Sequence, residues 1–178
     1  MIPDWMSSAT KPFDTVLVAN RGEIAVRVLR AAKESGLRGV AVYSDPDAGS
    51  LHVENADQAV HLPGTTLADT YLNGDAIIEA ARSTGAQAIH PGFGFLSERA
   101  DFANAVKAAG LIWIGPPANA IETMGDKISA RRCMIESGVP VIPGEEISMG
   151  GDSDHLGVLA SAAARVGYPL LLKASAGG

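Results

Sequence analysis

Two lysines in the sequence stand beside features that often surround phosphate groups. Lys173 ends an apolar run, and the small residues of KASAGG (173–178) follow it directly. In such a loop successive backbone N–H groups can form a nest that binds an anion. The segment is not a Walker motif, because its lysine precedes the glycines. From these residues alone, a phosphate-binding loop and a flexible hairpin tip are both open interpretations.

Lys127, the second of these lysines, ends the segment MGDK (124–127). It falls in the first turn after an expected helix break near Gly125. The helix dipole disfavours a cation at a helix N-terminus, by about 0.3–1 kcal/mol, unless an anion lies nearby. The position therefore hints at an anionic ligand, and an ordinary surface lysine is the alternative.

The segment HPGFGFLSE (90–98) holds the densest group of unusual residues. Gly92 and Gly94 flank the aromatic Phe93, and glycine lets a ligand approach the backbone closely. His90 stands at an expected strand end, without a catalytic partner nearby in the sequence. A structural hydrogen bond is therefore the favoured role for His90, and a ligand beside the glycines is the favoured role for the segment.

Three charged residues, Arg27, Arg30 and Glu34, are spaced three and four apart, so they share one face of an expected helix. A solvated, salt-bridged stripe is the simpler interpretation, and a polar subunit interface is the sharper one. The turn before this helix reads VANRGEIA, with Gly22 as its only glycine. It lacks the G-x-G-x-x-G pattern that brings a backbone close to pyrophosphate, which argues against an NAD or FAD site.

Short apolar runs alternate with helix-like segments through the first two thirds of the chain. The runs predict strands, and the segments between them predict helices, one of them over 97–110 with Ser97 as its N-cap. This alternation predicts an α/β fold with a parallel sheet covered on both faces, and ligands bind such sheets outside the carboxyl ends of the strands. The expected strands span 15–20, 38–44, 57–62, 86–91 and 111–115, and the helices 22–36, 70–85 and 97–110.

The pattern changes after Pro117. One or two helices with a break near Gly125 are expected, then a proline-containing linker or edge strand, a helix over 152–167 and a strand over 168–175. We therefore predict a boundary between Met124 and Val139. The expected organisation is a flexible leader (1–12), a front domain (13–124), a linker helix (125–138) and the beginning of a second domain (139–178).

Composition narrows the class of protein further. The chain is 47% hydrophobic and 19% charged, as globular proteins are, and its net charge of −6 argues against a general nucleic-acid binder. No apolar run approaches the roughly 20 residues that a membrane helix needs. The start resembles neither a secretory signal nor a transit peptide, and Met6 is an alternative first residue. A single cysteine, Cys133, excludes an internal disulfide and favours a cytoplasmic location.

Together these segments resemble the N-terminal part of a biotin carboxylase, the ATP-grasp component of biotin-dependent carboxylases such as the acetyl- and propionyl-CoA enzymes. The matching segments run in family order from about residue 13 to residue 178. They are VLVANRGEIAVRVLRA, HVENADQAV, TYLNGDAIIEAA, AIHPGFGFLSE, WIGP, MGDK, GVPVIPG and GYPLLLKASAGG.

The resemblance implies a Rossmann-like front domain followed by the start of an ATP-grasp lid. It implies a ligase that uses Mg-ATP to activate bicarbonate and then carboxylates biotin on a carrier protein or domain, in a dimeric enzyme that works with a carboxyltransferase, as in fatty acid biosynthesis. The Mg²⁺ ligands and the general base are expected beyond residue 178. We therefore expect neither a metal site nor a catalytic residue in this span, and we expect a truncated chain that is inactive alone.

The resemblance also implies roles for individual residues. Phe93 stands where the family usually has tyrosine, and Arg99 stands where it usually has asparagine. Because phenylalanine lacks the hydroxyl group of tyrosine, a hydrogen bond at residue 93 is in doubt. The implied roles are ATP binding by Lys127, Lys173, Gly177 and Gly178, lining of the biotin cleft by Phe93 and Gly94, and dimerisation through Arg27, Arg30 and Glu34. Two alternatives remain open: a non-catalytic dimerisation or docking module, and another ATP-grasp ligase.

Overall fold

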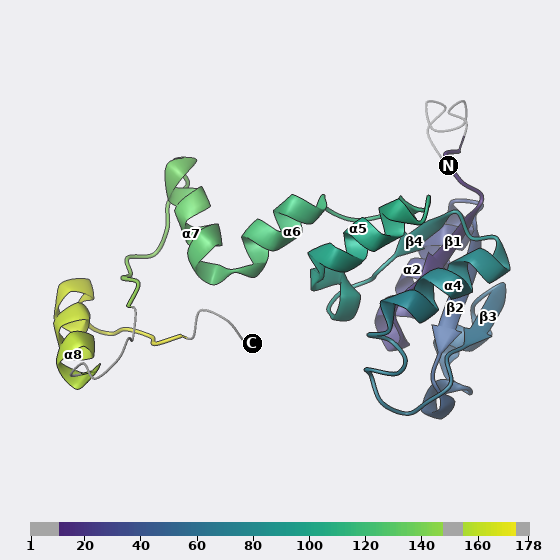
Figure 1. Cartoon of the computed structure of the whole chain (residues 1–178), viewed down its shortest axis with the longest axis horizontal. Coiled ribbons are helices and arrows are strands. Elements are labelled where there is room, and N and C mark those ends of the chain that lie inside the picture. The colour runs from purple at the N-terminus through teal and green to yellow at the C-terminus, as the bar shows by residue number, and fades with distance from the viewer. Residues whose placement is uncertain (1–10, 148–154, 174–178) are drawn as a thin grey trace. The chain divides into compact units, whose positions relative to one another are not determined.

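The structure is a computed structural model that describes residues 11–147 and 155–173 (Figure 1). The chain forms two compact units, Met1–Ile121 and Glu122–Gly178, which are described separately below. No helix within the described ranges is both long enough and apolar enough to cross a membrane.

A five-stranded parallel sheet forms the centre of the first unit. Its strands lie in the order β3-β2-β1-β4-β5, and each pairs in parallel with its neighbours. This arrangement confirms the predicted α/β fold with a parallel sheet. The strands are β1 (Thr15–Val18), β2 (Arg38–Tyr43), β3 (Gln58–His61), β4 (Ala88–His90) and β5 (Ile112–Trp113).

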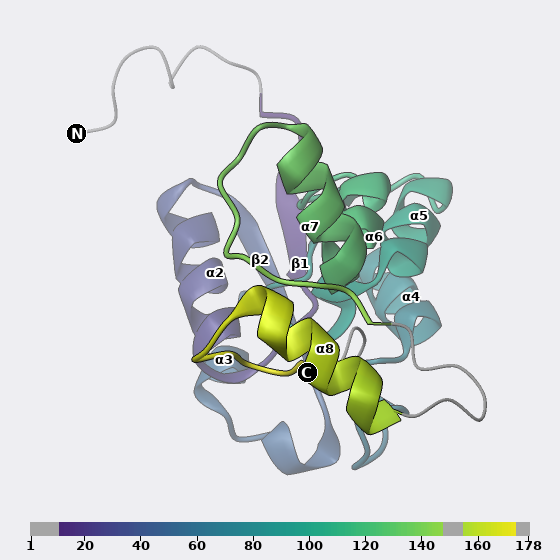
Figure 2. The same ribbon diagram turned by 90° about the vertical axis from the view of Figure 1, so that its left-hand side faces the viewer.

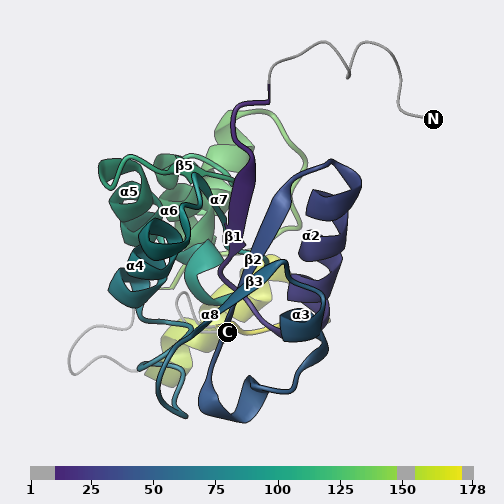
Figure 3. The same ribbon diagram turned by 90° about the vertical axis from the view of Figure 1, so that its right-hand side faces the viewer.

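Helices cover both faces of this sheet, as Figures 2 and 3 show from opposite sides. On one face lie α2 (Gly22–Glu34) and α3 (Leu51–Glu54), and on the other α4 (Gly74–Thr84) and α5 (Ala100–Ala108). Successive strand residues point to opposite faces. Leu17 accordingly packs in the core under α4 and α5, whereas Val18 packs with Leu29 of α2. Burial on both faces explains why the strands read as continuous apolar runs.

The direction of the chain across the sheet reverses at β1. From β1 the chain proceeds through β2 to β3 at one edge, and later returns to pair β4 on the other side of β1. The loops that follow β1 and β4 therefore leave the sheet in opposite directions. Such a switch point is where open α/β sheets usually bind ligands.

Two helix starts differ from the sequence prediction. Ser97 is not the N-cap of α5: it lies in a 3₁₀ turn, η2 (Phe95–Glu98), and α5 begins after Arg99. The helix expected from residue 70 begins at Gly74, because the Asn73 side chain accepts a hydrogen bond from the Ala76 N–H (3.1 Å) and caps α4 there.

The helix break predicted near Gly125 is confirmed. Helix α6 (Ala118–Gly125), which begins in the first unit, ends where Asp126 caps α7 (Lys127–Glu136) by accepting a hydrogen bond from the Ser129 N–H (2.7 Å). Residues 139–147 contain no helix or strand, and α8 (His155–Val166) follows.

The strand predicted over 168–175 is wrong for the part that the structure describes. Residues 168–173 form no strand, and Leu171 and Leu172 are exposed. A strand is stabilised by hydrogen bonds to a neighbour. No described segment pairs with this one, so its apolar sequence alone does not make it a strand.

Candidate functional site

One buried side chain joins the two loops that diverge at the switch point. Asn20, which follows β1 and is 3% exposed, donates hydrogen bonds from Nδ2 to the carbonyl oxygens of Pro91 (2.8 Å) and Phe93 (3.0 Å). Its Oδ1 accepts a hydrogen bond from the Arg21 N–H (2.9 Å). The position of the loop after β4 is therefore tied directly to β1.

The loop after β4 has an unusual backbone. Gly92 (φ 72°), Gly94 (φ 67°) and Phe95 (φ 51°) all adopt positive φ angles. The Gly92 N–H donates to Nδ1 of His90 (3.0 Å), the structural kind of hydrogen bond that the sequence favoured for this histidine. Burial lowers the pKa of His90, which keeps the accepting nitrogen unprotonated at neutral pH.

The two aromatic residues of this loop have opposite environments. Phe93 is 76% exposed. The Phe95 ring stacks on the ring of buried Tyr71, with 5.8 Å between centroids and 12° between planes. One ring therefore anchors the loop, and the other is free to contact a ligand.

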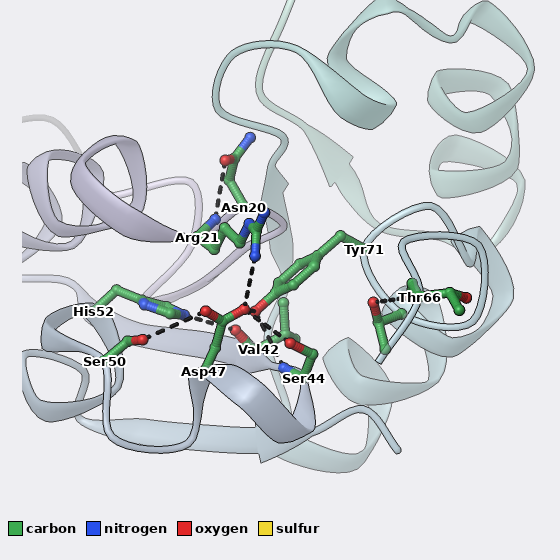
Figure 4. A network of polar contacts seen from close by, with 10 residues as sticks. Asn20, Arg21, Val42, Ser44, Asp47, Ser50, His52, Thr66 and Tyr71 are labelled. Atoms are coloured by element: carbon green, nitrogen blue, oxygen red, sulfur yellow. Dashed lines mark hydrogen bonds and ion pairs between the residues drawn. The ribbon is translucent and has the colours of Figure 1, made fainter. Parts of the chain in front are cut away.

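A polar network surrounds the hydroxyl group of Tyr71 (Figure 4). Oδ2 of Asp47, in the turn after β2, accepts hydrogen bonds from the Tyr71 hydroxyl (2.7 Å) and the Ser44 hydroxyl (2.8 Å), and it pairs with Nη1 of Arg21 (3.2 Å). The Arg21 guanidinium carbon lies 5.4 Å from the centroid of the Tyr71 ring and 6.0 Å from that of Phe95. These are cation–π distances, so one arginine holds a carboxylate and two rings together.

The network determines the charge states of its members. Burial works to raise the pKa of Asp47, but hydrogen bonds from Tyr71, Ser44 and Arg21 outweigh it and hold the pKa below the usual value. Burial, helped by the bond to Asp47, raises the pKa of Tyr71 to about 12. At neutral pH Asp47 is therefore a carboxylate and Tyr71 a neutral phenol.

High pH is expected to destabilise the first unit through Tyr71. The folded pKa of about 12 exceeds the ordinary value of 10.0, so the folded state retains this proton more tightly. Its contribution to stability is complete below pH 10 and is lost as the pH rises toward 12, with a slope of at most about 1.4 kcal/mol per pH unit. Ultraviolet titration of tyrosinate should show a step near pH 12 that Tyr71→Phe removes and Tyr43→Phe leaves. A step that survives Tyr71→Phe would refute the assignment.

The sequence analysis did not identify Arg21, Asp47 or Tyr71 as functional residues. The strands expected over 15–20 and 38–44 end beside Arg21 and Ser44, so two parts of the network could be located from the sequence, but not their contacts. Tyr71 carried no signal, because it was assigned to a helix that begins three residues later. Nearby His52 is fully buried, its Nε2 lies 3.1 Å from the Val42 oxygen, and its Nδ1 has no partner among the described residues.

The predicted interface residues Arg27, Arg30 and Glu34 are all exposed on α2. Within residues 11–147 and 155–173, none of the three takes part in an ion pair, so the salt-bridged form of the stripe is absent from this part of the chain. Arg99 does form an ion pair, with Asp101 in the first turn of α5 (2.6 Å).

The predicted phosphate-binding residues belong to the second unit. Lys127 is the exposed first residue of α7, and Lys173 is the exposed last residue of the described range. Gly177 and Gly178 lie outside the described residues. The described part of the chain contains no group of three or more His, Cys, Asp or Glu side chains that could hold a metal ion.

Comparison with known proteins places these features in a family. The family model for "Biotin carboxylase, N-terminal domain" matches residues 12–121. The methylcrotonoyl-CoA carboxylase subunit alpha of Oryza sativa is 53% identical over 93% of this chain and 22% of its own length. The biotin carboxylase of Halalkalibacterium halodurans is 48% identical over 93% of this chain and 36% of its own length.

Solved structures give the same result. The biotin carboxylase domain of Hydrogenobacter thermophilus 2-oxoglutarate carboxylase, a dimer crystallised with MgADP, ADP and bicarbonate, matches with a TM-score of 0.82 and 45% identity over 95% of this chain and 36% of that one. Urea carboxylase of Kluyveromyces lactis matches with a TM-score of 0.73 and 53% identity over 75% of this chain and 12% of that one. The chain thus spans about a third or less of the length of these relatives.

Proposed function

Because the chain belongs to the biotin carboxylase family, through its N-terminal domain, we propose that it forms the front part of an ATP-dependent ligase that carboxylates biotin. The observation that carries the proposal is the loop HPGFGFLSE, held at the switch point of the sheet with one aromatic ring exposed. A glycine-rich backbone beside an exposed ring suits a compact bicyclic group such as that of biotin, because the ring offers apolar contact and the backbone offers hydrogen-bonding groups for the ureido N–H and C=O.

The proposed reaction activates bicarbonate with Mg-ATP and transfers the carboxyl group to biotin on a carrier protein or domain. Lys127 and Lys173 are proposed to contact ATP phosphates through their ammonium groups, with Gly177 and Gly178 in the loop that follows Lys173. The Mg²⁺ ligands and the general base are proposed to belong to a later segment of the longer protein. A carboxyltransferase is the proposed consumer of carboxybiotin.

Phe93 and Gly94 are proposed to line the biotin cleft. With phenylalanine in place of the family's tyrosine, this position offers a ring face but no hydroxyl. Binding of biotin at this point would then depend on ring contact and on the half-buried backbone of Gly94, whose φ of 67° and ψ of −165° are accessible essentially to glycine alone.

A dimer through α2 is also proposed. Arg27, Arg30 and Glu34 are exposed, and Arg27 borders a cavity of about 340 Å³ whose other walls include Val16, Ala32 and Ile114. Charged side chains that form no ion pair with any other described residue, beside an apolar hollow, suit a partner surface. The longer protein whose front part this chain is proposed to form is called the parent protein below. Arg27→Glu should shift the parent protein toward monomers in sedimentation velocity, and Arg82→Glu, on α4, should not. Equal sedimentation of wild type and Arg27→Glu across protein concentrations would contradict this dimer.

Bicarbonate-dependent ATP cleavage tests the function. The parent protein should release phosphate from ATP only when bicarbonate is present, and faster when free biotin is added as acceptor. Residues 1–178 alone should release none. ATP cleavage whose rate depends on neither bicarbonate nor biotin would instead favour another ATP-grasp ligase. If the parent protein cleaves no ATP at all, a non-catalytic module would be favoured.

The acceptor of the carboxyl group is proposed to be chosen by other domains. Relatives named for methylcrotonoyl-CoA, propionyl-CoA and urea all match this segment at similar identity, so the segment does not separate them. A role in fatty acid biosynthesis and a cytoplasmic location stay predictions, and several relatives are named as mitochondrial.

A further inference from the structure

The side chain of Asn20 joins the loops after β1 and β4 through both its amide nitrogen and its amide oxygen. Both protons of its amide nitrogen go to the loop after β4, one to the Pro91 oxygen and one to the Phe93 oxygen. Its oxygen accepts a hydrogen bond from the Arg21 N–H. This bond holds the amide in the orientation in which its nitrogen, and not its oxygen, faces the loop after β4. Since the side chain is 3% exposed, water cannot readily replace these bonds.

A steric contact limits the same loop from the opposite direction. A Cβ atom on Gly92 would lie 2.6 Å from Nδ2 and 2.9 Å from Cγ of Asn20. The Gly92 backbone is therefore pressed directly against the amide that holds its two neighbours. The hydrogen bonds from Asn20 hold the loop close to β1, and the contact between Gly92 and Asn20 prevents a closer approach. The loop is therefore held at one distance from β1.

The exposed ring of Phe93 depends on this arrangement more than on its own packing. The ring is 76% exposed, and among the described residues it stacks on no other aromatic ring. Its backbone carbonyl, by contrast, is held by Asn20. The backbone therefore sets the direction of the Cα–Cβ bond of Phe93, and with it the region that the ring can reach.

We propose that Asn20 is a positioning residue for biotin: it touches no substrate, and it fixes the loop 91–96 so that Phe93 meets the biotin ring. The inference rests on the proposed function. It predicts that loss of the two donated bonds weakens biotin binding while ATP binding stays unchanged.

Asn20→Asp in the parent carboxylase tests this role. The substitution keeps the shape of the side chain and an oxygen for the Arg21 N–H, but it replaces the donating nitrogen with an oxygen that repels both loop carbonyls. With free biotin as acceptor, KM for biotin should rise about tenfold or more, as expected for two lost hydrogen bonds, while KM for ATP changes less than twofold. Asn20→Ala removes the same bonds without burying a carboxylate, and it serves where the aspartate variant does not fold.

Asn73→Asp is the matched control, because it makes the same isosteric change at a helix cap whose accepting oxygen it retains. A double-mutant cycle with Phe93→Ala then separates positioning from stability: if Asn20 acts through Phe93, the loss in biotin affinity from Asn20→Asp should nearly vanish in the Phe93→Ala background. Additive losses, an unchanged KM for biotin, or a parallel rise in KM for ATP would overturn the inference. A wild-type parent without biotin-dependent activity would overturn the proposed function itself, and the two failures are thereby distinguished.

Discussion

Gly92→Ala is expected to lower the free energy of unfolding of the first unit by about 2–5 kcal/mol. A left-handed backbone costs a residue with a Cβ about 1–2 kcal/mol, and Gly92 has a φ of 72°. The added Cβ would also lie 2.6 Å from Nδ2 of Asn20, and overpacking of this kind costs roughly 1–3 kcal/mol more. Urea unfolding monitored by circular dichroism measures the loss.

Gly85→Ala is the matched control for this prediction. Gly85, which follows α4, has a φ of 70°, and no atom lies within 4 Å of the position that its Cβ would take. This variant should lose only the backbone term, about 1–2 kcal/mol. Equal losses for the two alanine variants would mean that the loop after β4 yields freely, and that Asn20 does not hold it at a fixed distance.

Removal of either proposed phosphate-binding lysine should have the largest effect on activity. A hydrogen bond to a charged group contributes about 1.5–3 kcal/mol, so Lys127→Gln and Lys173→Gln should each lower kcat/KM for ATP by roughly 10- to 150-fold in the parent enzyme. Arginine at either position keeps the charge and should recover part of the loss.

Lys107→Gln provides the control, since Lys107 is an exposed lysine on α5 with no proposed ligand. Its kcat/KM should stay within twofold of the wild type. If the three glutamine variants behave alike, neither Lys127 nor Lys173 contacts ATP, and the phosphate site must be sought elsewhere in the parent protein.

The sheet could be predicted from the sequence because its strands are buried on both faces. Residues such as Leu17 and Val18 pack against different helices, so both must be apolar, and the resulting run is visible without a structure. The same reasoning located the strand ends, and therefore the edge of the sheet where Asn20 and the loop 91–96 meet.

The polar network could not be predicted, because its parts are distant in sequence. Asp47 lies 26 residues from Arg21 and 24 from Tyr71, and only the strand order brings these residues together. The error at Ser97 is of another kind. Serine is a common N-cap, but here a 3₁₀ turn occupies residues 95–98, and α5 starts after an arginine whose side chain makes no capping bond. The preference of serine for the N-cap position was therefore overridden by the backbone geometry of the glycine-rich loop after β4.

The pairing of β1 with β4 has a consequence for how the chain emerges from the ribosome. Val16 pairs with Ala88, and α4 and α5, the helices that cover Leu17, are made long after it. A nascent chain that has reached only β3 can form β1, α2 and β2, but one face of that partial sheet stays uncovered. Such exposed apolar surface favours aggregation or chaperone binding during synthesis. We therefore expect slow translation between residues 62 and 113 to reduce the yield of folded protein, because it prolongs the interval in which the central strand lacks its second neighbour.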